Sequence, residues 1–258
     1  MGPMKRMVVL TGGSDSNLQY ARSAAHAIKC HNVEVMCVIS SKRSDPIVAE
    51  TTRQILCPDK PIFRSGKPWK NDRIMKYIHT NCEVGISTGF DYIIHPEFLN
   101  AVPVINCHPA ALPINRGCHH SFWGIMEKTP LGGTIHWMIE ELDAGPIIDQ
   151  EIFHDDGVMT AQDIQEKSEQ ICAKLIKKNL GKILLGKITG LEQKGGSYHS
   201  RSEIIAAATL EVGKHVEVGK LFDLCRATAC KNNGFFIVKN NKKFLIKIHG
   251  IEEVNCDG

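Results

Sequence analysis

The sequence lacks long apolar runs. In its 258 residues no stretch approaches the roughly 20 apolar residues that cross a bilayer, and no apolar segment of signal-peptide length follows residues 1–10. Arg6 stands where a myristoylation signal has Ser or Thr. The net charge of +3 is too small to indicate a nucleic-acid or membrane surface. We therefore expect a cytoplasmic protein without nucleic-acid or membrane partners.

The motifs of two common nucleotide-binding folds are also missing. No G-x-G-x-x-G follows the first apolar segment, and no acidic residue ends the second one near Ile39. A nicotinamide-dependent oxidoreductase needs both features. No G-x-x-x-x-G-K-[ST] occurs either, which excludes a P-loop nucleotidase.

Cysteine pairs with metal-binding or redox spacing are absent, although the chain has ten cysteines. None of them forms a C-x-x-C pair, and several lie in apolar patterns, where cysteine packs as a small hydrophobe. Cys118, His119 and His120 are neighbours, but adjacent ligands cannot readily share one tetrahedral zinc ion. We expect reduced thiols, no disulfide framework and no metal.

The first half of the chain alternates strands and helices, with 43% hydrophobic and 23% charged residues overall. The pattern is typical of a parallel sheet covered by helices in a globular protein. The expected elements are strands at 7–10, 33–39, 84–88 and 102–107, a turn at 11–17, a helix from Leu18 that carries Ala21, Ala24, Ala25 and Ile28 on one face, and a helix at 71–80.

The second half predicts a hairpin, a long helix and a small appendage. The strands are expected at 134–139 and 146–153, a capping box at Thr160–Asp163, the helix up to Leu185, a second helix at 220–227, and a second hairpin around Asn240 and Asn241. The fold class is therefore α/β, with a Rossmann-like, mostly parallel sheet, helices on both faces and a small C-terminal β-hairpin/α appendage. We expect a catalytic domain at 1–190 and a subdomain at 191–258 that contributes to a homodimer.

Asn106, His108 and Asp143 are the most informative polar side chains. The first two lie in N-C-H-P-A-A-L-P at 106–113, where a strand should end at the carboxyl edge of the sheet, the edge at which open α/β folds bind ligands. Asp143 lies in I-E-E-L-D-A-G-P at 139–146. The amide can donate to the oxygen of a tetrahedral intermediate, the imidazole can move a proton, and the carboxylate can orient the imidazole. These groups suffice to move a carbonyl-level group onto an amine.

These motifs, with Arg116-Gly117 between them, resemble the signature of the folate-dependent formyltransferases over roughly residues 7–185. The resemblance implies transfer of a formyl group from N10-formyltetrahydrofolate to an amine by Asn106, His108 and Asp143, without a metal. It places the folate between the sheet edge and the Ile139–Asp143 loop. The residues expected to contact the folate are Thr88, Gly89, Phe90, Ile139, Glu140, Glu141 and Leu142. Ala110-Ala111 and Ala144 depart from the residues usual in the family.

Segments further along the chain resemble the sugar N-formyltransferases, which act on nucleotide-linked aminodeoxysugars such as dTDP-4-amino-4,6-dideoxyglucose. They are residues 119–123, 132–136, 197–199, 224–228 and 235–236. The resemblance implies that the aminosugar contacts His120, that Phe122 or Trp123 stacks on it, and that Arg116 meets its pyrophosphate. Phe122, Trp123 and Phe90 can equally be packing residues, and Arg116 a solvated charge.

Other readings remain open. The loop at 12–18 resembles the phosphate-binding loop of glycinamide ribonucleotide formyltransferase, with Ser14 at the phosphate, although Asp15 is unfavourable there. The basic stretch at 226–247 suits methionyl-tRNA formyltransferase, or only a solvated hairpin face. A formyltetrahydrofolate hydrolase would keep the same three residues. A non-catalytic binding protein would have no need of them.

Overall fold

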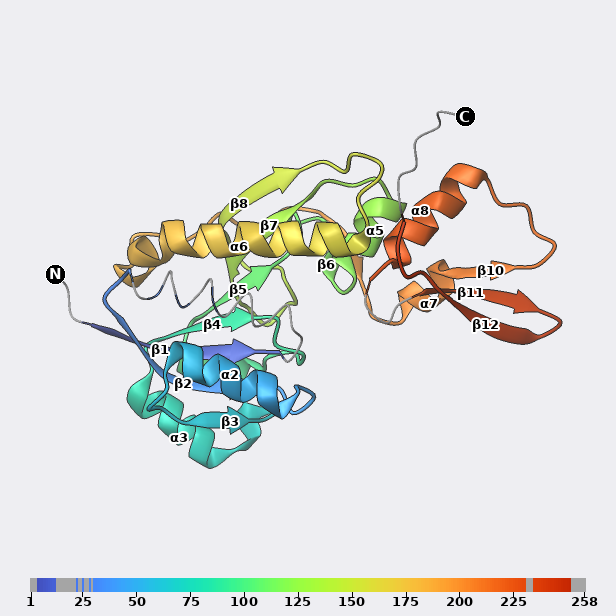
Figure 1. Ribbon diagram of the computed structural model, residues 1–258. Helices are drawn as coiled ribbons and strands as arrows, with labels where there is room; N and C mark the ends of the chain where they lie inside the picture. The colour runs from blue at the N-terminus through green and yellow to red at the C-terminus, as the bar shows by residue number, and fades with distance from the viewer. Residues whose placement is uncertain are drawn as a thin grey trace.

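A computed structural model describes residues 4–12, 22, 25, 28, 30–230 and 234–251. Ser14 and most of the helix expected from Leu18 lie outside the described residues; Ala25 and Ile28 are described and buried. Figure 1 shows a layered α/β body and a smaller unit at the C-terminal end of the chain. In the described part of the chain, no helix is both long and apolar enough to cross a membrane.

A seven-stranded sheet in the order β3-β2-β1-β4-β5-β7-β8 forms the centre of the body. The first five strands in this order are parallel, β7 is antiparallel to β5, and β8 is antiparallel to β7. The strands are β1 (Lys5–Thr11), β2 (Val33–Ser40), β3 (Ile62–Arg64), β4 (Val84–Thr88), β5 (Val104–His108), β7 (Leu131–Trp137) and β8 (Ile147–Phe153). The expected α/β class with a mostly parallel sheet is confirmed.

Helices cover both faces of this sheet because successive strand side chains point to opposite sides. Met7 and Val9 belong to the core packed against α6, whereas Val8 and Leu10 belong to the core packed against α3 and α4. The helices of the body are α2 (Pro46–Leu56), the 3-10 helix η1 (Pro68–Lys70), α3 (Asp72–Asn81), α4 (Pro96–Ala101), α5 (His120–Met126) and α6 (Ala161–Leu184).

The long helix α6 begins at the expected capping box and lies close to β7. The Thr160 hydroxyl accepts from the Asp163 N–H, and the Asp163 carboxylate accepts from the Thr160 N–H. A Cβ on Gly133 of β7 would lie 2.6 Å from the Ser168 carbonyl oxygen and 2.9 Å from the sulfur of Cys172. Gly133 therefore permits a close approach of the helix to the strand.

The C-terminal unit consists of a three-stranded sheet and two helices. Its elements are α7 (Glu203–Ala207), β10 (Thr209–Glu211), α8 (Val218–Thr228), β11 (Gly234–Lys239) and β12 (Lys242–Lys247). β11 and β12 are antiparallel, and Asn240 and Asn241 between them have positive φ angles of 51° and 58°, as a two-residue hairpin turn requires. The expected second hairpin is therefore present.

This unit packs against the body through a core of its own. Phe122 of α5 and Ile164 of α6 share an apolar cluster with Leu224 of α8 and Phe235 of β11. Beside it, the buried Arg226 pairs with Asp155 at 2.6 Å and with Asp223 at 2.8 Å. The predicted boundary at residue 190 stays a prediction, since the segment that follows also returns to the body. Its strand β9 (Tyr198–His199) pairs with β6 (Arg116–Gly117).

We predict that Gly133→Ala lowers the free energy of unfolding by about 1–3 kcal/mol, the usual cost of overpacking, because the new methyl group meets the α6 backbone. Chemical denaturation measures the change. Gly219→Ala is the matched control, since its Cβ would find only Glu217 Oε1 at 3.8 Å, an ordinary contact. Equal stabilities of the two variants would contradict the close packing of β7 and α6.

Candidate active site

Asn106, His108 and Asp143 meet at the carboxyl end of β5. Asn106 Nδ2 donates to Asp143 Oδ1 at 3.0 Å, and His108 Nδ1 lies 3.6 Å from Asp143 Oδ2. His108 and Asp143 are buried, with 5% and 7% of their surfaces exposed. The three side chains that the sequence singled out therefore converge on one small region at the edge of the sheet.

The Asp143 loop is held by the backbone and by a distant segment. Asp143 has a positive φ of 53°, and its Oδ2 accepts from the Gly117 N–H at 3.0 Å. Gly117 itself has a φ of 90°, and a Cβ there would lie 2.4 Å from the His199 carbonyl oxygen. Gln193 Nε2 donates to the carbonyl oxygens of Asp143 and Gly145 at 2.9 and 2.7 Å. The carboxylate is therefore fixed from both sides of its turn.

The hydrogen bonds of His108 define the tautomer of its neutral ring. Its Nε2 lies 3.0 Å from the Asn115 carbonyl oxygen, which can only accept, so Nε2 carries the proton. The lone pair of Nδ1 is then directed toward the region of Asp143. A proton taken up at Nδ1 would be stabilised by the carboxylate, while Nε2 keeps its bond to Asn115.

His136 supports Asn106 from the neighbouring strand. In the β5–β7 ladder His136 is paired directly with Asn106. Its Nδ1 lies 2.9 Å from the Trp137 carbonyl oxygen and so carries the proton, which leaves Nε2 to accept from Asn106 Nδ2 at 3.2 Å. Asn106 thus gives one amide hydrogen to His136 and the other to Asp143.

The electrostatics of the site favour an ionised Asp143 carboxylate and a neutral His120 ring. Burial raises the pKa of Asp143, but the neighbouring His108 and His136 rings and the hydrogen bond from the Gly117 N–H outweigh it and hold that pKa below its usual range. Burial, with a smaller contribution from His108, lowers the pKa of His120 to about 3. His120 is therefore neutral at physiological pH.

The residues expected around the folate divide into two groups. Ile139, Glu140 and Leu142 line a small slot that ends at His136 and Asp143 and includes Ile93 and Ile94. The other predicted residues lie outside its lining: Thr88 is buried with its hydroxyl 3.4 Å from the Leu10 carbonyl oxygen, Gly89 has a φ of 71°, Phe90 packs near Tyr92, and Glu141 pairs with Arg116.

The residues expected around the aminosugar are also placed unequally. His120 lies edge-on to His108 with ring centroids 5.7 Å apart, and the buried Phe122 lines a neighbouring cavity. Trp123 stacks on His199 at a centroid distance of 4.0 Å, so one face of its ring is already covered. Arg116 Nη1 is engaged by Glu141 at 2.7 Å. Ser14 lies outside the described residues.

Sequence reasoning missed several groups of the site. His136 was noted only within a motif, yet the register of β5 and β7 places it beside Asn106. The Gly117 N–H and the Asn115 carbonyl are backbone groups, which carry no side-chain signal. Gln193 lies just past the domain boundary expected at residue 190, in a Lys- and Gly-rich stretch without a motif. Within residues 4–12, 22, 25, 28, 30–230 and 234–251, no three His, Cys, Asp or Glu side chains gather as a metal site.

We predict that Asp143→Asn destabilises the protein at neutral pH and that the difference from the wild type shrinks in acid. The folded pKa of Asp143 is depressed, so the stability from its charge is present above the unfolded pKa of about 4 and is lost as the pH falls toward the folded pKa. Denaturation at a series of pH values measures this. A difference that stays constant with pH would contradict the charged state.

Comparison with known proteins agrees with this geometry. A family model described as Formyl transferase matches residues 5–179. Methionyl-tRNA formyltransferase from Bacillus cereus is 29% identical over 136 residues, which is 52% of this chain and 43% of that protein. The match therefore spans less than half the length of this curated relative.

Solved structures share the fold. A 4-N formyltransferase from Francisella tularensis superposes with a TM-score of 0.81 at 24% identity, covering 98% of this chain and 100% of that one. A sugar N-formyltransferase from a Shewanella species gives 0.77 at 22% identity, with 97% and 99% covered. Glycinamide ribonucleotide transformylase 1 from Symbiobacterium toebii gives 0.61 at 20% identity, with 74% and 96% covered. Because the family model spans most of the chain and its strand-end motif forms one site, the chain belongs to the formyl transferase family.

Proposed function

We propose that this protein transfers a formyl group from N10-formyltetrahydrofolate to the amino group of a nucleotide-linked amino-dideoxysugar, such as dTDP-4-amino-4,6-dideoxyglucose. The observation that carries the proposal is the convergence of Asn106, His108 and Asp143, with contacts of 3.0 and 3.6 Å around one carboxylate. Family membership supports the reaction, and the near full-length likeness to sugar N-formyltransferases supports the acceptor.

We place the folate against the surface of the slot beside Asp143. Ile93 and Ile139 are 66% and 44% exposed at its rim, and Leu142 lines it, so a flat pterin ring can cover apolar surface that water now reaches. His136 and Asp143 also line the slot, so a ring that covers it lies beside the catalytic groups. The co-substrate supplies an activated formyl group, and the chain supplies the groups that handle protons and charge.

His108 moves the proton. Its Nδ1 lone pair accepts a proton from the attacking amine, because Nε2 is already committed to the Asn115 carbonyl oxygen. The imidazolium that results lies 3.6 Å from the Asp143 carboxylate, which stabilises its charge. The same nitrogen then returns the proton to the leaving nitrogen of the folate. Asp143 acts by orienting and stabilising the ring.

Asn106 stabilises the charge that develops on the carbonyl oxygen. Both hydrogens of its amide are used, one by Asp143 at 3.0 Å and the other by His136 at 3.2 Å. One of these bonds is exchanged for a bond to the oxygen as its negative charge grows. The longer bond, to the His136 ring nitrogen, costs less to release than a bond to a carboxylate. An amide donor of this kind typically contributes about 3 kcal/mol to lowering the barrier.

A sugar acceptor accounts for more of the molecule than the alternatives. A tRNA acceptor would use the basic stretch from Arg226, but Arg226 is buried and paired with Asp155 and Asp223. Glycinamide ribonucleotide as acceptor depends on the loop around Ser14, which lies outside the described residues. Incubating the protein with N10-formyltetrahydrofolate and each acceptor in turn tests the choice. Folate turnover that is equal with and without an acceptor would instead indicate a hydrolase.

We predict that His108→Ala and Asp143→Ala each abolish measurable turnover, which means a loss in kcat of roughly 10²- to 10⁴-fold or more. His108→Ala removes the nitrogen that accepts the proton, and Asp143→Ala removes the carboxylate that stabilises the protonated ring. Folate binding, measured by calorimetry, should remain largely intact in both variants. His154→Ala is the matched control, since His154 is exposed and does not line the slot beside Asp143. Undiminished rates in either active-site variant would remove the mechanism.

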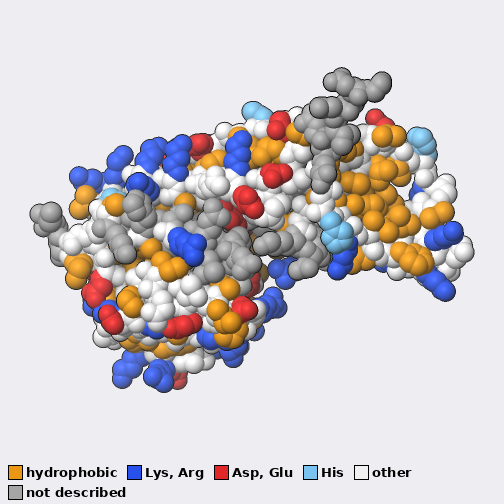
Figure 2. All heavy atoms as spheres, in the orientation of Figure 1, with side chains coloured by type: hydrophobic (Ala, Val, Ile, Leu, Met, Phe, Trp, Pro, Cys, Tyr) orange, Lys and Arg blue, Asp and Glu red, His pale blue; other side chains and the backbone are white. Residues whose placement is uncertain are grey.

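We also expect a homodimer that forms through the C-terminal unit. Figure 2 shows hydrophobic side chains gathered over this unit. Val218 and Phe222 of α8 are 80% and 40% exposed, and Phe244 of β12 is 48% exposed. Burying these exposed side chains against a second copy would remove apolar surface from water.

We predict that sedimentation shows a dimer for the wild type and a shift toward monomer for Phe222→Glu, because the new charge would be buried at the interface. The control Val158→Glu changes a residue that is 64% exposed and lies on the body, so it should leave the dimer intact. A monomeric wild type would discard the dimer.

A further inference from the structure

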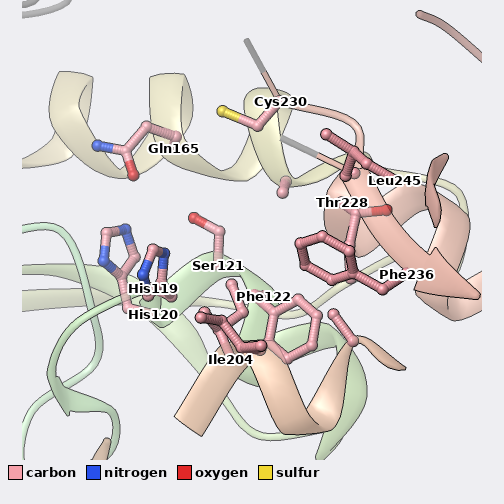
Figure 3. A pocket seen from close by; sticks show the side chains of 15 residues that line it. His119, His120, Ser121, Phe122, Gln165, Ile204, Thr228, Cys230, Phe236 and Leu245 are labelled. Atoms are coloured by element: carbon pink, nitrogen blue, oxygen red, sulfur yellow. The ribbon is translucent and has the colours of Figure 1, made fainter. Parts of the chain in front are cut away.

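A cavity of about 350 Å³ lies between the catalytic body and the C-terminal unit. Its walls come from α5, α6, α7, α8, β11 and β12. Figure 3 shows it from close by, with His120 and Gln165 on one side and Phe236 and Leu245 on the other. This volume falls in the range of small-molecule sites. The sequence did not predict the cavity, because its lining comes from separate segments between His119 and Leu245.

One end of the cavity is polar and adjoins the catalytic centre. His120 lines this end, and its ring lies edge-on to His108 at 5.7 Å. Ser121 is 6% exposed, and its hydroxyl has no hydrogen-bond partner among the described residues. In Figure 3 this hydroxyl points into the space between α5 and α6. A buried hydroxyl without a partner is costly, and a ligand group that bonds to it would remove that cost.

The opposite end is mainly apolar, with Thr228 and Cys230 as its polar exceptions, and the described residues of the lining are uncharged. Phe122, Ile204, Phe236 and Leu245 form the apolar walls. Among the described residues that line the cavity there is no Lys, Arg, Asp or Glu. Burial keeps His120 neutral by lowering its pKa to about 3. The described lining residues offer a phosphate group no countercharge, whereas an uncharged ring with polar groups on one edge matches both ends.

We propose that this cavity is a specificity pocket for the acceptor, and that it takes an uncharged ring with hydrogen-bonding groups directed to Ser121 and His120 and an apolar or methyl-bearing side against Phe122 and Phe236. The inference rests on the proposed function. In a nucleotide-linked deoxysugar two parts have this chemistry, the deoxyhexose and the pyrimidine base. The diphosphate between them lies outside the cavity.

Two variants and one control test the pocket. Ser121→Ala removes the buried hydroxyl, and Leu245→Ser alters the apolar wall at a residue that is 46% exposed. Val212→Ser is the matched control, since Val212 is 59% exposed in the same unit and does not line the cavity. Thermal melting of all three verifies that they fold.

The first measurement is independent of catalysis. Saturation-transfer NMR follows the binding of two uncharged probes, thymidine and methyl 6-deoxyglucoside, to the wild type and the three variants. We expect Ser121→Ala and Leu245→Ser to reduce the signal of one probe and Val212→Ser to leave it unchanged. Loss of the thymidine signal assigns the pocket to the base, and loss of the glycoside signal assigns it to the sugar.

The second measurement is kinetic. Ser121→Ala should raise the KM for the nucleotide sugar roughly fivefold, the effect of losing one neutral hydrogen bond, with kcat and the KM for folate unchanged. The pocket proposal is overturned if the wild type binds neither probe, if neither pocket variant weakens a probe, or if Val212→Ser has the same effect. A wild type that binds a probe in a Ser121-dependent way but formylates no nucleotide sugar would instead refute the proposed function.

Discussion

The buried carboxylate of Asp143 is the group on which the active site depends. It accepts from Asn106 of β5 and from the Gly117 N–H of β6, and it faces His108 and His136. A carboxylate buried to this degree is stable only if it is hydrogen-bonded or paired, and these contacts supply its partners. The same contacts join the Asp143 loop to β5 and β6. The carboxylate therefore fixes the position of the backbone around the site and also takes part in its chemistry.

This arrangement determines which donors and acceptors of the resting site are already paired. Asn106 has no amide hydrogen left over, and His108 has its Nε2 committed to Asn115. The one ring nitrogen of His108 that remains available as a base is Nδ1, on the side of the carboxylate. The resting site is thus satisfied internally, and the reaction proceeds by exchanging one existing bond for another. Little reorganisation is then needed when charge develops.

The sequence predicted the elements whose signals are local. The capping box at Thr160, the asparagine turn at Asn240 and the strand ending in the Asn106 motif were all read correctly, because each depends on residues a few positions apart. The helix α2 was missed, although Asp45 caps it and Pro46 begins it. His136 and Gln193 could not be assigned to the site from the sequence. The role of His136 follows from the register of β5 and β7, and that of Gln193 from a hydrogen bond to the backbone of Asp143, 50 positions earlier.

By itself the sequence determined the chemical groups: an amide, an imidazole and a carboxylate, in motifs that identify the family. It also determined the alternation of strands and helices, since periodicity is a property of neighbouring residues. The tertiary structure alone decided which tautomers the rings adopt, that Arg116 is held by Glu141, and that a cavity opens between α5 and the C-terminal unit. These features depend on contacts between residues far apart in the chain, and burial and charge pairing at such contacts are fixed only when the segments pack together.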